Sequence, residues 1–251
     1  MLKALLLCIA TFIAGSPMNA RADDAPLLKS SHFAFYAHGN ATLPAVQELA
    51  DAVEHDYDKV LAAFDTVPAK DLQVHVYADQ WRYALATGNF NASGSIAGTA
   101  RVHLVQQPDD KKVVVHEFVH AVVLKMLIDR APQPFDEKAF DQKFKTFPVW
   151  LWESLAVYEA GQFLDPRTLR YLAKGQYPRL AELSERARGG KAYAVGYTII
   201  EYILEQHGKE KLLSLIANYG DVPATLALSD EEFAAAWYRF VQEKYLKAPQ
   251  A

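Results

Sequence analysis

The fold of this chain is decided by the stretch Val113-Val114-Val115-His116-Glu117-Phe118-Val119-His120-Ala121-Val122-Val123. Its only polar side chains are two histidines and one glutamate, and the acidic pair Asp109-Asp110 lies shortly before it. An acidic start and an otherwise apolar run predict a buried helix from about Asp109 to Met126. On a helix, His116 and His120 lie one turn apart on the same face, and Glu117 points away from that face.

These three polar side chains need a compensating partner if the helix is buried, because burial of a polar group without one is unfavourable. The ring nitrogens of His116 and His120 could converge on one ion at about 2.0–2.1 Å, the usual distance from zinc to imidazole. Glu117 could then hold a water molecule beside the ion. The pattern therefore predicts a zinc site. The alternative is a helix with two hydrogen-bonded core histidines.

A third ligand is offered by Glu153, since a catalytic zinc usually has three protein ligands and keeps its fourth position for water. Glu153 is the one carboxylate in the apolar stretch Pro148-Val149-Trp150-Leu151-Trp152-Glu153-Ser154-Leu155-Ala156-Val157-Tyr158. This stretch predicts a helix with proline at its first position. An acidic residue in so apolar a helix is expected to be paired or to bind a cation. Glu159 lies roughly 240° further around the helix, so we expect it to be solvated or to contact a ligand residue.

Together these residues resemble a known family. The motif His116-Glu117-x-x-His120, followed by Pro148-x-Trp150-Leu151-x-Glu153-Ser154-Leu155-Ala156-x-Tyr158, is similar to that of the gluzincin metallopeptidases. It is most similar to the small peptidase-MA-like domains related to the catalytic core of zinc aminopeptidases. The resemblance covers about residues 95–245 and includes Tyr193-Ala194-Val195-Gly196. The family usually has glycine after its third ligand, where this chain has Ser154.

The resemblance implies a zincin-like fold and a zinc-dependent peptidase. The implied ligands of Zn²⁺ are His116, His120 and Glu153. The implied general base is Glu117, which would deprotonate a water whose pKa zinc lowers from about 15.7 to about 7. The implied oxyanion stabiliser is Tyr193, as a phenol donor. Tyr197 lies one turn from Tyr193, so either could be the donor, and either could instead be a packed aromatic residue.

Small residues over 91–100, followed by the β-rich run Arg101-Val102-His103-Leu104-Val105, predict a loop that enters an edge strand over 99–106. In gluzincins such a strand pairs with an extended substrate. Zinc aminopeptidases carry an acidic residue there that binds a free amine, and this chain has no Asp or Glu between Asp79 and Asp109. The sequence therefore favours an endopeptidase. His103 could project into the cleft, although a histidine in a strand is more often structural.

The N-terminus predicts export. Lys3 precedes an apolar core from Ala4 to Ala14, and Ala20-Arg21-Ala22 fits a cleavage site, so we expect a signal peptide over residues 1–22. The core is too short for a membrane span, which needs roughly 20 residues. The only cysteine, Cys8, lies inside it, so the mature chain would have no disulfide. These features predict a periplasmic or secreted bacterial protein.

The remaining chain, residues 23–251, is expected to form one α+β domain. Periodicity predicts an α+β lobe over 23–126 with a small mixed sheet and a mainly helical lobe over 148–251, with the zinc between them. Strands are expected at 32–37 and 72–78 and helices at 43–65, 166–174, 179–187, 193–207, 209–219 and 230–246. We read residues 131–147 as a surface excursion.

The composition of the chain narrows the classes of molecule that it could bind. The net charge of −4, without a dense stripe of Lys and Arg, argues against nucleic acid. The favoured reading is an exported zinc endopeptidase whose partner is a peptide or protein substrate. Two alternatives stay open, a non-catalytic zinc-containing binding or scaffold protein and a zinc amidase that acts on cell-wall peptides. The sequence does not predict an oligomeric state.

Overall fold

The computed structural model describes residues 25–107, 110–185 and 190–247. The chain divides into two compact units, Met1–Asp129 and Arg130–Ala251. The expected signal peptide over residues 1–22, with Cys8, lies outside the described residues. Within the described part of the chain, no helix is both long and apolar enough to cross a membrane.

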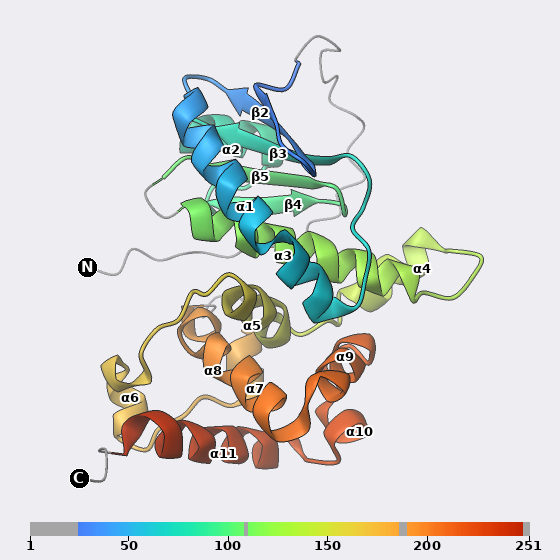
Figure 1. The fold of residues 1–251 in the computed structure, drawn as a ribbon. Coiled ribbons are helices and arrows are strands. Elements are labelled where there is room, and N and C mark those ends of the chain that lie inside the picture. Colours follow the sequence, from blue (N-terminus) through green and yellow to red (C-terminus); the bar gives the residue numbers. More distant parts are fainter. Residues whose placement is uncertain (1–24, 108–109, 186–189, 248–251) are drawn as a thin grey trace. The chain divides into compact units, whose positions relative to one another are not determined.

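The first unit contains a five-stranded mixed sheet with the strand order β1-β2-β3-β5-β4 (Figure 1). The three inner strands β2, β3 and β5 run parallel, and the edge strands β1 and β4 pair antiparallel with their neighbours. The strands are β1 (Leu28–Lys29), β2 (Phe33–His38), β3 (Leu72–Tyr77), β4 (Gly94–Ala97) and β5 (Arg101–Val105). With the helices described below, the sheet confirms the predicted mixed α+β class.

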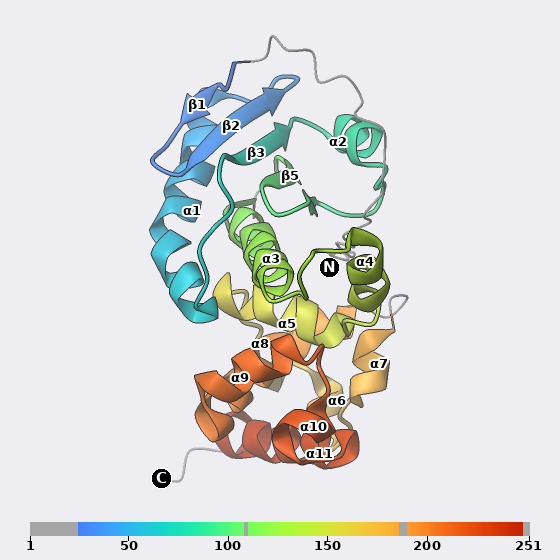
Figure 2. The same ribbon diagram turned by 90° about the vertical axis from the view of Figure 1, so that its right-hand side faces the viewer.

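Helices cover the two faces of this sheet unequally. Helices α1 (Leu43–Phe64) and α3 (Asp110–Asp129) share one face, where the Phe33 ring of β2 lies 5.1 Å from Phe118 of α3 and 5.8 Å from Tyr57 of α1. The short helix α2 (Gln80–Thr87) packs at the end of β3, away from α1, as Figure 2 shows. The Tyr83 ring of α2 lies 5.8 Å from Tyr77. Since Tyr77 alternates with the core residues of β3, α2 covers part of the opposite face.

Helix α3 is buried around most of its circumference. The sequence predicts this helix, and the structure extends it three residues beyond the expected end at Met126, while the expected start at Asp109 lies outside the described residues. Nearly every residue from Val113 to Leu127 is buried. A helix that is apolar all round occupies the centre of a fold rather than its surface.

The prediction that residues 99–106 form an edge strand is wrong. Residues 101–105 form β5, which lies inside the sheet, and the edge is β4, within the segment read as a loop. The two strands form a hairpin in which Gly98 adopts a φ of +66°, a conformation that glycine adopts without strain. The strand was missed because Gly94-Ser95-Ile96-Ala97 is short and rich in small residues, which gives little β-propensity.

In the second unit, all the regular secondary structure of the described residues is helical. Its elements are α4 (Glu137–Phe144), α5 (Val149–Glu159), a 3-10 turn (Pro166–Thr168), α6 (Arg170–Ala173), α7 (Leu180–Ser184), α8 (Gly190–His207), α9 (Lys209–Ala217), α10 (Val222–Leu226), α11 (Asp230–Val241) and a π-helical turn (Gln242–Leu246). The helices expected at 193–207, 209–219 and 230–246 are confirmed. The helix expected at 166–174 is broken at Leu169, and residues 186–187 at the expected end of the next lie outside the described residues.

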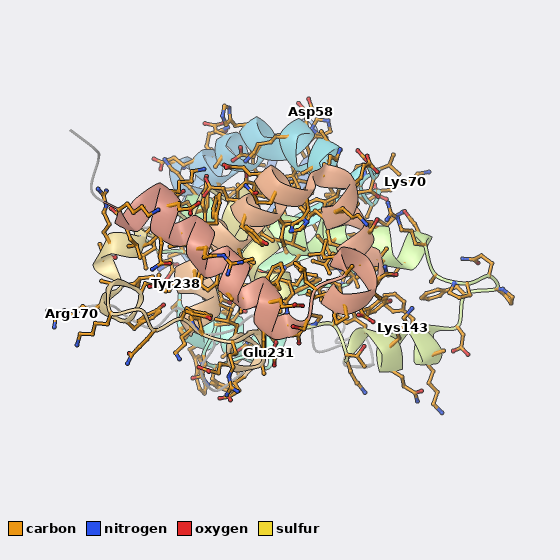
Figure 3. All side chains as sticks on the ribbon, turned by 90° about the horizontal axis from the view of Figure 1, so that it is seen from below. Asp58, Lys70, Lys143, Arg170, Glu231 and Tyr238 are labelled. Atoms are coloured by element: carbon orange, nitrogen blue, oxygen red, sulfur yellow. The ribbon has the colours of Figure 1, made fainter. Side chains whose placement is uncertain are left out.

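Helices α5 and α8 approach closely at Gly196. A Cβ atom on Gly196 would lie 2.9 Å from the Cα atom of Ser154, so the glycine permits the approach. Helix α11 packs on α8, where the indole of Trp237 donates a hydrogen bond to Thr198 Oγ1 at 3.1 Å. The hydroxyl of Tyr238, labelled on α11 in Figure 3, donates to the carbonyl of Leu172 at 2.8 Å. The last two contacts join α11 to α8 and to α6.

Candidate metal centre

The two histidines of α3 meet inside the protein. His116 and His120 are 3% and 1% exposed, and their Nε2 atoms lie 3.1 Å apart with the rings perpendicular. Two imidazole ligands of a tetrahedral zinc would place their nitrogens about 3.3 Å apart at the usual bond lengths. The observed separation also fits a hydrogen bond between the rings, so the surroundings of the pair must distinguish the two readings.

Glu117 lies beside this pair and against the edge strand. Its side chain is 1% exposed, and it faces Gly94 of β4 so closely that a Cβ atom at Gly94 would lie 2.5 Å from Glu117 Oε1. The carboxylate is thus held in a fixed place at the sheet edge, on the same helix as the histidine pair.

Glu153 is one of two buried carboxylates of α5. It is 1% exposed, and its neighbours Leu151, Trp152 and Ser154 are also buried. Pro148 is the N-cap and precedes the first helical residue, whereas the sequence predicts proline at the first helical position. Glu159 is 6% exposed, which excludes the expectation that it is solvated. The remaining expectation, contact with a ligand residue, is still a prediction.

The group His116, His120 and Glu153 could hold a metal ion. Each residue offers one ligand atom, and these atoms all lie within 4.8 Å of one another. Within the part of the chain that the structure describes, no other three His, Cys, Asp or Glu side chains have this arrangement. Two buried imidazoles and one carboxylate are a donor set that suits zinc, so the residues fit the ion that the sequence predicts.

The two candidate tyrosines lie in α8 and are both half-buried. The Tyr197 ring packs 4.8 Å from Tyr158 and 5.0 Å from Phe163. Burial first, and the nearby Glu201 carboxylate next, raise the pKa of Tyr197. Tyr197 is therefore part of an aromatic cluster, as expected for a packed aromatic residue. The role of Tyr193 as an oxyanion donor remains a prediction.

His103 lies on the sheet face opposite Val102 and Leu104, the core residues of β5. The register aligns it with His75 of β3, and the two rings stack at 4.9 Å. The hydroxyl of Tyr77 hydrogen-bonds to its Nδ1 at 3.0 Å. These contacts agree with a structural role. Burial lowers the pKa of His103 to about 3 and that of His75 to about 4.

Sequence reasoning missed two features of this region. Gly94 contacts the carboxylate of Glu117, and its only signal in the sequence is a glycine among small residues before a strand. The histidine ladder of His38, His75 and His103 spans three adjacent strands, with His38 Nε2 lying 2.9 Å from His75 Nδ1. The alternation of β3 predicts that His75 faces away from the core. The three rings come together because β2, β3 and β5 are neighbours in the sheet, and the sequence pattern does not reveal this strand order.

Comparison with known proteins adds no family assignment. No protein-family model matches the chain, and no curated protein matches it. The case for function therefore depends on the residues themselves.

Proposed function

We propose that this protein is a zinc-dependent peptidase with a zincin-like fold of the gluzincin type, in which His116, His120 and Glu153 hold Zn²⁺. The observation that carries the proposal is the group of three buried ligand atoms within 4.8 Å of one another. The sequence supports it independently, because Glu117 stands next to a ligand in the spacing that zinc hydrolases use. Residues 1–22 are the proposed signal peptide, which would direct export and be removed, so that the mature enzyme would be periplasmic or secreted.

A bound zinc ion would polarise the substrate carbonyl and lower the pKa of water. Glu117 accepts the proton from the attacking water and passes it to the leaving amine, as one carboxylate can act first as base and then as acid. Its near-complete burial keeps bulk water away from this proton transfer. Tyr193 is the proposed hydrogen-bond donor to the oxygen on which negative charge develops.

The edge strand β4 is the proposed docking element for the peptide. Val105 donates its N–H to the carbonyl of Ser93 at 2.8 Å, so the alternating antiparallel pattern joins Ser95 with His103 and Ala97 with Arg101. The N–H and C=O of Ile96 then point away from β5. No strand pairs with that side of β4 among the described residues. An extended peptide could add there through main-chain hydrogen bonds, which favours an endopeptidase acting within a chain.

The test combines metal analysis with a peptide-cleavage screen. We expect the purified protein to contain one zinc and to cleave a proteome-derived peptide library. Glu117→Gln should keep the zinc and lose about 10²–10⁴-fold in kcat, because it removes the proton acceptor and no ligand. Glu137→Gln, a change at an exposed glutamate of α4, is the matched control. A zinc-loaded wild type that leaves the library intact would favour the binding protein, and cleavage confined to cell-wall peptide amides would favour the amidase.

A further inference from the structure

We propose that Gly94 is a positioning residue for the general base: because it lacks a side chain, β4 can hold the carboxylate of Glu117 directly against its backbone. The inference rests on the proposed function for its catalytic meaning. Its physical basis, the fit between a glycine and a glutamate, is independent of that function.

The contact is closer than any other residue type would allow. A Cβ atom on Gly94 would lie 2.5 Å from Oε1, 2.8 Å from Cγ and 2.9 Å from Cδ of Glu117. These three atoms are the nearest to it and all belong to one side chain. Ordinary contacts begin near 3.4 Å. An added methyl group must therefore displace the carboxylate by about 1 Å, a misplacement that can reduce catalysis about 10²-fold.

The backbone of Gly94 does not itself require glycine. Its φ lies outside the left-handed region, since the described glycines with such a φ are Gly39, Gly88, Gly98, Gly161, Gly175, Gly208 and Gly220. Alanine at position 94 would therefore meet no backbone strain, and replacement of glycine by alanine at an unstrained position usually stabilises a protein. The glycine at position 94 is explained by the Glu117 side chain, which lies opposite it.

The strand also connects the base to the proposed substrate. Gly94 and Ile96 face the same side of β4, and the main-chain groups of Ile96 point away from β5. The strand that would pair with the peptide at Ile96 is thus the strand whose Gly94 contacts the carboxylate. One short strand would set the distance between the base and the peptide bond.

The first experiment is a double-mutant cycle on thermal unfolding with Gly94→Ala, Glu117→Ala and the double variant. We expect Gly94→Ala to lower Tm by roughly 5 °C through overpacking against Glu117. In the Glu117→Ala background the same change should leave Tm unchanged or raise it, because the clashing atoms are gone. Gly190→Ala is the matched control, since a Cβ atom there meets nothing within 4 Å. An equal loss of Tm in both backgrounds would overturn the proposal.

The second experiment measures the Gly94→Ala enzyme. We expect its zinc content to match the wild type, its kcat to fall about 10²-fold and its KM to change less, because the base moves and the ligands stay. Wild-type kcat in this variant, or loss of its zinc, would overturn the positioning role. If the wild type cleaves nothing, the proposed function fails, while the unfolding cycle still decides whether Gly94 seats Glu117.

Discussion

Two buried tyrosine hydroxyls in the helical unit differ in whether they donate a hydrogen bond, and single substitutions can measure what this difference contributes to stability. Tyr238 donates to the Leu172 carbonyl, whereas the hydroxyl of Tyr171 is buried without a hydrogen-bond partner among the described residues. Burial raises the pKa of Tyr171 to about 12. We expect Tyr171→Phe to keep or increase the free energy of unfolding and Tyr238→Phe to reduce it by about 1 kcal/mol. Urea unfolding of both variants tests this, and equal losses would contradict it.

The histidine ladder makes stability depend on pH. His75 and His103 titrate near 6.5 in the unfolded chain, but burial lowers their folded pKa to about 4 and about 3, with the neighbouring histidines and Arg101 adding to the effect. The unfolded state therefore binds more protons as the pH falls below 6.5. Stability should be complete above pH 6.5 and decrease progressively towards pH 3, by the order of a few kcal/mol.

Urea midpoints between pH 7.5 and pH 4 measure this effect, with His103→Gln as the comparison. Carboxylates contribute to the slope in both proteins, so the difference between the two curves isolates His103. We expect a shallower loss in the variant. Identical curves would show that His103 does not resist protonation in the folded state.

At the scale of elements, the contact between α5 and α8 fixes the helix that carries Glu153. A Cβ atom on Gly196 would lie 2.7 Å from Oγ and 2.9 Å from Cα of Ser154, and a Cα atom cannot move aside as a side chain can. We expect Gly196→Ala to lower the free energy of unfolding by about 1–3 kcal/mol. Thermal unfolding measures it, with Gly190→Ala as a control in the same helix. Equal stability of the two variants would contradict the close approach.

Elements with a clear apolar pattern were predictable, and elements without one were not. The alternation of apolar residues in β3 indicates one buried face. The nearly continuous apolar runs of α3 and α5 indicate helices that are buried on all sides. Helix α4 was not predicted within the surface excursion over 131–147, since it is mostly exposed and buries only Phe140. The strand β4 was missed because it is short and because its glycine, Gly94, is explained by the Glu117 side chain, which lies far away in the sequence.

At the scale of the whole molecule, the candidate metal ligands were predictable for a chemical reason. A charged or polar side chain in an apolar helix is rare, so His116, His120 and Glu153 are conspicuous in the sequence. The donor tyrosine was not predictable in this way, because tyrosine suits both packing and hydrogen bonding and the chain has 13 of them. The Tyr197 ring packs within the helical unit, and the choice between Tyr193 and Tyr197 as the donor stays a prediction.

Removal of the metal should destabilise the whole molecule. An ion that binds the folded chain more tightly than the unfolded chain stabilises it by about 2.7 kcal/mol when free zinc is 100 times its Kd. The proposed ligands come from two helices far apart in the sequence, so local folding of one helix cannot reproduce the site. We expect chelation to lower Tm and added Zn²⁺ to restore it. Mg²⁺ should not restore it, because that ion prefers oxygen ligands.

Two variants make this prediction specific to the three ligands. Glu153→Ala should lose most of the rise in Tm that zinc produces, because two imidazoles alone hold the ion weakly. His103→Gln, at a histidine of the sheet ladder, should keep that rise in full. If zinc stabilised Glu153→Ala as much as the wild type, the ion would be bound elsewhere, and the assignment of Glu153 as the third ligand would be wrong.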